Sequence, residues 1–130
     1  MSPFESCKLV LTGLCLTALM ATGPALAKAP VTADIQPTIR LQELPRQGEQ
    51  VYALIHQGGP FESEKDGTVF GNRERLLPLF RRGYYREYTV PTPGLRHRGA
   101  RRIVCGGRPV KPDVCYYTAD HYASFRKIVP

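Results

Sequence analysis

The longest apolar run of the chain lies close to its start. Leu9–Ala21 is interrupted only by threonine and glycine, and it is followed by a Gly-Pro pair and by the sequence Ala25-Leu26-Ala27. A run of this length that ends in an A-x-A cleavage pattern is typical of a secretory signal peptide and is short for a membrane-spanning helix. We therefore predict that residues 1–27 are a signal peptide, in preference to an anchor helix, and that the remaining chain is secreted.

Beyond residue 27, the hydrophobic pattern predicts a single helix. Residues 28–45 are rich in proline, alanine and threonine, and they predict a loose N-terminal lead-in with a short ordered piece at Ile39–Leu44. In Gln47–His56 the apolar side chains recur at the i, i+3, i+4 spacing of a helix face. The glycines and proline of Gly58–Pro60 follow directly, and glycine there is typical of a helix end.

After the helix, the pattern changes to short runs of β-branched and aromatic residues bounded by glycine and proline. The predicted strands are Thr68–Phe70, Tyr84–Val90, Arg101–Cys105, Val114–Thr118 and Ser124–Val129. This order predicts an α+β fold, with one short helix packed on a small twisted antiparallel sheet in a single domain over residues 46–130. The expected core is small and consists of Val51, Leu54, Ile55, Val69, Leu76, Leu77, Tyr85, Ile103, Val104 and Phe125.

Charge and cysteine content narrow the class of protein. The chain carries a formal net charge of +7, and the predicted signal peptide removes one lysine and one glutamate, so the excess remains. A basic exported protein favours polyanions such as nucleic acid or an anionic surface. Cys105 and Cys115 predict one disulfide that pins a hairpin, because two cysteines in an exported domain most simply pair. They do not predict zinc, since no histidines lie nearby at ligand spacing.

A single carboxylate, Glu87, lies in the arginine-rich stretch between Tyr84 and Arg108. Strand alternation puts Arg98 and Arg102 on one face of the segment expected to pair with the strand of Glu87. If the two segments pair, Glu87 can meet Arg102, with Arg98 nearby. Two guanidinium forks suit the oxygens of a phosphate, although a surface salt bridge on a basic protein is the competing interpretation.

His121 can supply the acid that such a site needs. Histidine changes charge near neutral pH, so it can protonate a leaving oxygen while an ionised Glu87 accepts a proton. A carboxylate, a histidine and two arginines suit cleavage of a phosphodiester by an adjacent hydroxyl, with no metal. The same basic face also suits a secreted protein that binds nucleic acid without cleaving it, and this alternative stays open.

The amino-acid sequence also resembles that of a known family. The resemblance rests on three stretches: GPFESEKDGTVFGNRERLLP, GYYREYTVPTPGLRHRGARRIV and DVCYYTADHYASFRKI. They resemble the small extracellular guanyl-specific ribonucleases of bacteria, the barnase-like family, and above all its short streptomycete-type members. Motifs, order and spacing agree from about Leu54 to Ile128. The chain departs from the family at Gly71, where close relatives often carry a polar side chain, and in the positions of its cysteines.

The resemblance implies an endoribonuclease that needs no metal or cofactor and cuts single-stranded RNA on the 3′ side of guanosine through a 2′,3′-cyclic phosphate. It makes Glu87 the general base, His121 the general acid, and Arg98 and Arg102 the phosphate-binding arginines. Tyr122 matches a tyrosine that contacts the phosphate. The guanine-binding loop matches Phe70, Gly71, Asn72, Arg73 and Glu74, in which Glu74 would accept hydrogen bonds from the guanine N1–H and amino groups.

The resemblance also carries expectations about partners. The family implies an acidic barstar-like inhibitor that covers the site, and we expect a monomer without stable membrane association. The same activity could serve an exported toxin whose target is RNA inside another cell. The sequence does not separate this role from a scavenging one.

Overall fold

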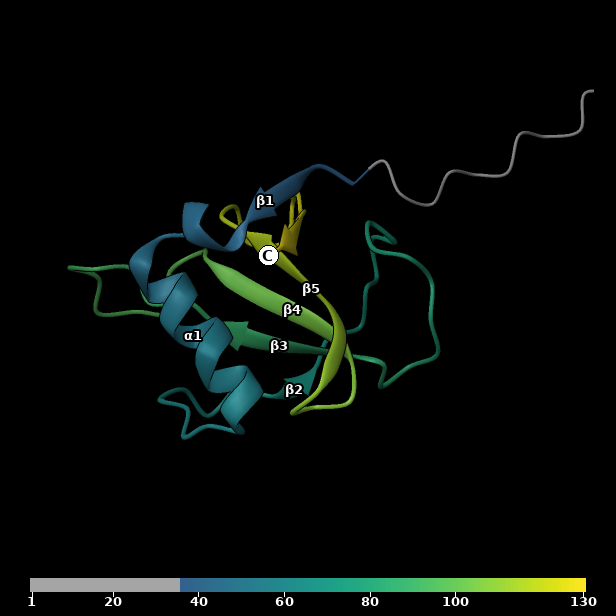
Figure 1. The fold of residues 1–130 in the computed structure, drawn as a ribbon, viewed down its shortest axis with the longest axis horizontal. Helices are drawn as coiled ribbons and strands as arrows, with labels where there is room; N and C mark the ends of the chain where they lie inside the picture. The colour runs from purple at the N-terminus through teal and green to yellow at the C-terminus, as the bar shows by residue number, and fades with distance from the viewer. Residues whose placement is uncertain (1–35) are drawn as a thin grey trace, which may run out of the picture. The chain divides into compact units, whose positions relative to one another are not determined.

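The computed structural model describes residues 36–130, which belong to one compact unit (Figure 1). The predicted signal peptide and the first part of the lead-in lie outside the described residues. The elements are β1 (Thr38–Arg40), the 3-10 helix η1 (Leu41–Glu43), α1 (Arg46–Gln57), β2 (Thr68–Val69), β3 (Tyr85–Thr89), β4 (Arg102–Gly107), β5 (Pro112–Thr118) and β6 (Arg126–Val129). Within this part of the chain, no helix is long and apolar enough to cross a membrane.

The strands form one six-stranded sheet in the order β1-β6-β5-β4-β3-β2. Neighbouring strands from β2 to β6 are antiparallel, whereas β1 pairs in parallel with β6 and makes the sheet mixed. The sequence predicted only the antiparallel part. In β1 only Ile39 is buried, opposite Ile128 of β6, so a three-residue strand with a single buried side chain leaves no periodic pattern.

Helix α1 begins and ends close to its predicted bounds. Val51 and Ile55 are buried against the sheet, while Leu54 is only half-buried. Gly58 adopts the left-handed conformation with φ 84°, which is open to glycine at little cost. Its N–H donates to the carbonyl of Ile55, and the N–H of Gly59 donates to that of Leu54. The glycine pair therefore ends the helix in the way that the sequence predicted.

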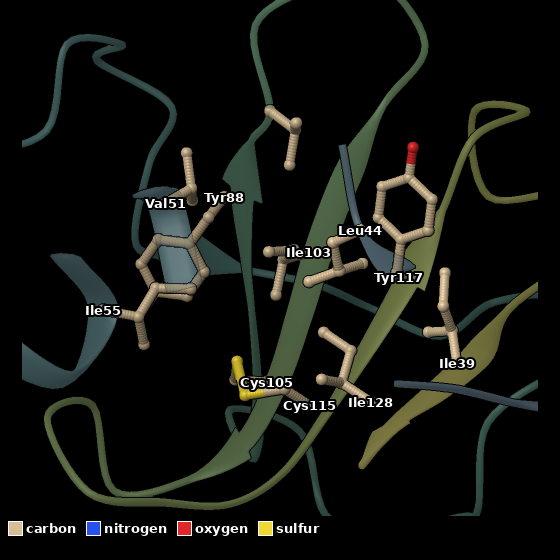
Figure 2. Packing of buried hydrophobic residues seen from close by; sticks show 11 residues of the cluster. Ile39, Leu44, Val51, Ile55, Tyr88, Ile103, Cys105, Cys115, Tyr117 and Ile128 are labelled. Carbon is tan, nitrogen blue, oxygen red and sulfur yellow. A yellow bond between two sulfur atoms is a disulfide. The ribbon is translucent and has the colours of Figure 1, made fainter. Parts of the chain in front are cut away.

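The two faces of the sheet carry two separate buried clusters. The cluster under α1 (Figure 2) consists of Ile39, Leu44, Val51, Ile55, Tyr88, Val90, Ile103, Cys105, Cys115, Tyr117 and Ile128. The cluster on the opposite face consists of Leu77, Tyr85, Val104, Tyr116 and Phe125. Val69 and Leu76 were wrongly predicted to be core, because they are 39% and 41% exposed. Val69 belongs to a two-residue edge strand, and Leu76 lies in the long loop between β2 and β3.

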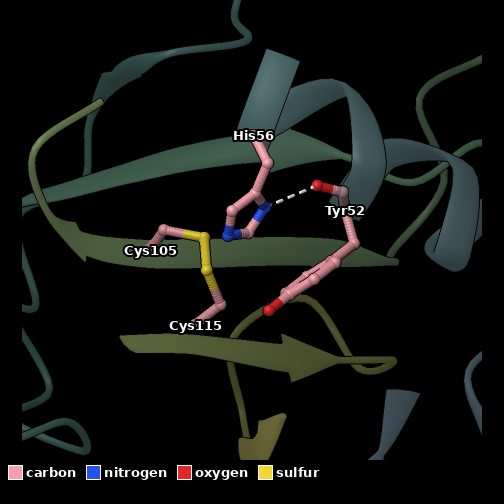
Figure 3. Close-up of a disulfide and its surroundings, with 4 residues drawn as sticks. All are labelled: Tyr52, His56, Cys105 and Cys115. Atoms are coloured by element: carbon pink, nitrogen blue, oxygen red, sulfur yellow. Dashed lines mark hydrogen bonds between the residues drawn. A yellow bond between two sulfur atoms is a disulfide. The ribbon is translucent and has the colours of Figure 1, made fainter. Parts of the chain in front are cut away.

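The predicted disulfide joins the two central strands. Cys105 of β4 lies directly opposite Cys115 of β5, with 4.1 Å between their Cα atoms. The bridge faces α1, next to Tyr52 and His56 (Figure 3), and the side chain of Glu87 lies on the other face of the sheet. The cross-link therefore contributes to the layer between helix and sheet and not to the face that carries the candidate chemistry.

Reduction of the disulfide should lower the free energy of unfolding by about 2–3 kcal/mol, because the cross-link closes a short loop and restricts the unfolded chain. Urea unfolding of the oxidised and reduced protein, followed by circular dichroism, measures the change. The variant Cys105→Ala/Cys115→Ala is the control, since a reductant cannot affect it. An unchanged midpoint after complete reduction would contradict the stabilising role.

Candidate functional site

A cleft of about 650 Å³ opens on the face of the sheet that α1 leaves uncovered. Its walls come from the loop after β2, from Glu87 in β3 and from the loop between β5 and β6. The lining residues are Phe70, Gly71, Asn72, Arg73, Glu74, Leu76, Glu87, His121, Tyr122, Ala123 and Phe125. All the predicted substrate-binding residues, together with the predicted base and acid, thus border one cleft. The two predicted arginines are not part of its lining.

The carboxylate of Glu87 is held by one hydrogen bond on each oxygen. Arg98 donates from Nη2 to Oε1 at 2.9 Å, and the Tyr122 hydroxyl donates to Oε2 at 2.8 Å. The same guanidinium also donates to the hydroxyl of buried Thr89, from Nε at 2.9 Å and from Nη2 at 2.8 Å. Because both oxygens have a fixed partner, the plane of the carboxylate is oriented before any ligand arrives.

Arg98 lies near Glu87 as predicted, whereas the predicted contact between Glu87 and Arg102 is not found. The register puts Glu87 opposite Val104 and Arg102 opposite Thr89, so the ion pair of Glu87 is with Arg98 and the predicted meeting with Arg102 does not form. Arg98 comes from the loop between β3 and β4, which turns back over the end of β3. The alternation of strand side chains could not predict the path of that loop.

Arg102 is an almost fully buried cation below the site, with 2% of its surface exposed. Its Nη1 donates to the main-chain oxygens of Arg98 and Arg101, and its guanidinium carbon lies 5.9 Å from the centre of the Tyr122 ring. Within residues 36–130, its Nε is a buried donor without a hydrogen-bond partner. A buried charge with a spare donor favours an anion nearby.

Tyr122 joins the carboxylate to the aromatic wall of the cleft. Its ring stacks on Phe70 with 5.0 Å between the ring centres. Burial, together with the hydrogen bond to Glu87, raises the pKa of Tyr122 to about 12. The hydroxyl therefore stays protonated throughout the neutral range and remains a hydrogen-bond donor.

A network of side chains shapes the loop that carries His121. The Thr118 hydroxyl accepts from the N–H groups of Asp120 and Tyr122 and donates to the Asp120 carboxylate, which also accepts from the N–H and hydroxyl of Ser124. The N–H of His121 donates to the carbonyl of Ala100 at 2.9 Å. His121 itself is exposed at the rim, so the loop and not burial fixes its position.

The predicted base-binding loop is braced by Asn72. Its side-chain amide donates to the carbonyl of Leu77 at 3.0 Å and accepts from the N–H of Leu77 at 3.1 Å. The Asn72 side chain is thereby engaged within the protein. Arg73 and Glu74 are exposed beside it, so their main chain and the Glu74 carboxylate are accessible from the cleft.

The described non-glycine residues with positive φ all lie in these two loops: Asn72 (49°), Arg75 (56°), His121 (54°) and Tyr122 (72°). Such conformations cost free energy and concentrate at functional sites. Neither these conformations nor the bracing by Thr89, Thr118 and Asp120 was predicted from the sequence. The spacing of Thr118, Asp120 and Ser124 was the available signal, because these residue types bond to nearby backbone in turns.

The arrangement combines a fixed proton acceptor, an ionisable imidazole, a neutral hydroxyl donor and two guanidinium groups around one cleft. A proton can be taken on the side of Glu87 and given on the side of His121, with Arg98 next to Glu87 and Arg102 against the ring of Tyr122. Such a set suits general acid–base chemistry on an anionic ligand.

Comparison with known proteins agrees with this chemistry. A family model described as ribonuclease matches residues 27–129. The chain is 48% identical over 95 residues to guanyl-specific ribonuclease Sa of Kitasatospora aureofaciens, a match that covers 73% of this chain and 96% of that protein. It is 55% identical over 85 residues to guanyl-specific ribonuclease Sa3 of the same organism, a match that covers 65% of this chain and 58% of that protein. The match thus spans little more than half of Sa3.

Solved structures show the same fold. Ribonuclease Sa2 in complexes with mononucleotides matches with a TM-score of 0.68 and 43% identity, over 73% of this chain and 95% of that chain. A second structure of that protein contains guanosine-2′-cyclophosphate and matches with a TM-score of 0.66 and 43% identity, over 73% of this chain and 97% of that chain.

The network around Asp120 should make stability depend on pH. Hydrogen bonds from Ser124 and Thr118 lower the pKa of Asp120 from its usual 3.8, so its carboxylate stabilises the fold above that value, and the contribution is lost as the pH falls through the lower folded pKa. Asp120→Ala should cost about 1 kcal/mol of unfolding free energy at pH 7 and less at pH 3. Urea unfolding at both pH values measures this, with exposed Glu64→Ala as the control. An equal cost at both values would exclude the effect.

Proposed function

This chain belongs to the ribonuclease family, and we propose that it is a guanyl-specific endoribonuclease that cleaves single-stranded RNA on the 3′ side of guanosine without a metal ion or cofactor. One observation carries the proposal. A carboxylate held by an arginine and a tyrosine, Glu87, lines the same cleft as His121 and the loop of residues 70–74. An acid–base pair and a base-binding loop are thus within reach of one nucleotide.

In the first step, Glu87 accepts the proton of the ribose 2′-hydroxyl, and the 2′-oxygen attacks phosphorus. The bond from phosphorus to the 5′-oxygen of the next nucleotide breaks, and His121 gives its proton to that oxygen. A 2′,3′-cyclic phosphate and a free 5′-hydroxyl result. DNA lacks the 2′-hydroxyl, so it would bind without being cleaved.

In the second step, the roles of the two groups are exchanged. His121, now neutral, accepts a proton from water, the water oxygen attacks phosphorus, and Glu87 returns its proton to the 2′-oxygen. The products are a 3′-guanylate end and the starting protonation states of both side chains. Because the second step returns the proton that Glu87 gained and the proton that His121 lost in the first, no external acid or base is required.

The arginines stabilise the negative charge that develops on phosphorus. Arg98 lies directly beside Glu87, and Arg102 provides a buried charge and a spare Nε donor beneath Tyr122. Positive groups already in place lower the barrier without reorganising during the reaction. Tyr122 adds a neutral hydroxyl next to the same phosphate.

Guanine selection is assigned to the loop Phe70–Glu74. The Glu74 carboxylate can accept from N1–H and the amino group of guanine, and loop N–H groups can donate to O6. Asn72 contributes through its main chain, since its side chain is bonded to Leu77. Gly71 offers no side-chain contact to the base. The site has room for a side chain at this position, because a Cβ there would meet only Arg73 at 3.6 Å.

We also propose that the protein acts outside the cell as a monomer. The signal-peptide pattern and the Cys105–Cys115 bridge support export, because disulfides persist in oxidising compartments. An acidic barstar-like protein that covers the basic cleft is the expected inhibitor. A scavenging role and a toxin role both fit this chemistry, whereas a non-catalytic binder would not need the ordered Glu87.

Glu87→Gln and His121→Gln should each lower kcat/KM for the dinucleotide GpC by at least about 100-fold, because each removes one of the two proton-transfer groups. Steady-state hydrolysis in the presence of a chelator measures the loss. Circular dichroism and binding of a guanosine oligonucleotide should stay close to wild type. Wild-type turnover by either variant, or a requirement for a divalent metal, would refute the assignment.

Glu74→Ala should remove the preference for guanine and leave the proton-transfer groups in place. A site that hydrogen-bonds its substrate discriminates strongly, so the difference in transition-state stabilisation between GpC and ApC should shrink by several kcal/mol, on the order of 10³-fold or more in the ratio of their kcat/KM values. Glu64→Ala removes the same charge from a neighbouring loop and serves as the control. An unchanged ratio would show that guanine is read elsewhere.

A further inference from the structure

The long loop between β2 and β3 lines the cleft up to Leu76, but its later part carries a surface that the proposed ribonuclease chemistry does not use. Its segment Arg75–Arg82, here called the arginine–leucine loop, reads RLLPLFRR. Leu79 and Phe80 are 65% and 56% exposed, the highest values among the described large hydrophobic residues. Figure 1 shows the chain between β2 and β3 leaving the sheet on the side of the view away from α1.

The exposed Phe80 ring is held in place from below. It stacks on Tyr84 at 3.9 Å with only 13° between the ring planes, and it meets the edge of Tyr85. The Tyr84 ring in turn lies on Gly106 of β4, where even a Cβ would overlap it. Tyr84 also donates from its hydroxyl to Asp113. The apolar tip is therefore a supported feature and not a side chain that failed to find the core.

The charged residues of the arginine–leucine loop are all arginines. Arg75 precedes it, Arg81 and Arg82 follow it, and all three are exposed. Arginines on both sides of a protruding apolar tip combine the two terms that bind a protein to a charged bilayer, which are apolar insertion and attraction to anionic headgroups.

A nucleic-acid strand would use this tip less well. Leu79, the most exposed of the described large hydrophobic residues, offers neither an aromatic face nor a hydrogen-bonding group, and Phe80 keeps only one open face because Tyr84 covers the other. Base stacking needs an open aromatic face. The composition of the tip thus favours a lipid surface over an extension of the RNA path.

We propose that the arginine–leucine loop is a membrane-docking site that inserts Leu79 and Phe80 into the interface of an anionic phospholipid bilayer. The binding is peripheral and reversible, which is compatible with the expected absence of stable membrane association. It goes beyond the proposed ribonuclease activity and does not require it, because neither side chain lines the cleft.

The chain contains no tryptophan, so a single introduced indole reports on this site alone. Leu79→Trp should show a blue-shifted emission with phosphatidylcholine–phosphatidylglycerol vesicles and no shift with phosphatidylcholine vesicles. Leu95→Trp, at another exposed leucine, should show no shift with either. Equal shifts for the two variants, or none for Leu79→Trp, would overturn the proposal.

Vesicle co-sedimentation gives an independent test. Leu79→Ser should lower partitioning into the anionic vesicles by about tenfold, whereas Val110→Ser should not. Arg81→Gln/Arg82→Gln should lower it more than Arg40→Gln/Arg46→Gln, which has the same net charge. Hydrolysis of GpC by Leu79→Ser should stay at the wild-type rate, so the test is separate from that of the enzyme. Unchanged partitioning with slower cleavage of long RNA would instead identify the loop as an RNA subsite and refute membrane docking.

Discussion

The alternation of side chains along β3, β4 and β5 is the constraint on which the rest of the structure depends. On one face, Tyr88, Ile103 and Tyr117 pack under α1 together with the disulfide. On the other, Glu87 and Arg102 share the surface with a second, smaller cluster. A shift of one residue in the register of β3 or β4 would turn the side chains of that strand to the opposite face, and would place Glu87 or Arg102 under the helix.

Because the two faces are separate, the cleft face can contain features that destabilise the fold. Among residues 36–130, a buried arginine with an unpaired donor and four non-glycine residues with positive φ are all unfavourable on their own. They persist because the helix side supplies most of the buried apolar surface and the cross-link. The packing under the helix thus offsets the unfavourable conformations and the buried charge on the cleft face.

Much of this fold could be predicted from the sequence because its parts leave local patterns. Val51 and Ile55 mark the helix face, Gly58 marks its end, and Cys105 and Cys115 fall at facing positions of two predicted strands. The parallel strand β1 left no such pattern, since it pairs with the far end of the chain through one buried isoleucine. Tertiary contact alone makes it a strand.

The sequence predicted which residues form the site better than it predicted how they are arranged. Glu87 and His121 could be singled out from chemistry and resemblance. That Arg98, and not Arg102, would bind Glu87 depended on the path of a loop, which no hydrophobic period describes. The left-handed conformations of Asn72 and His121 were equally hidden, because neither residue is a glycine.

The close approach of Tyr84 to Gly106 has a consequence for how related chains can diverge. The ring occupies the space that any side chain at position 106 would need, so the two positions cannot change independently. A homologue with a larger residue at 106 must carry a smaller one at 84, and the two positions should co-vary in an alignment. Without the tyrosine, Phe80 would lose the ring on which it stacks. A substitution in β4 would therefore change the position of Phe80, although Phe80 lies in a loop distant from β4 in the sequence.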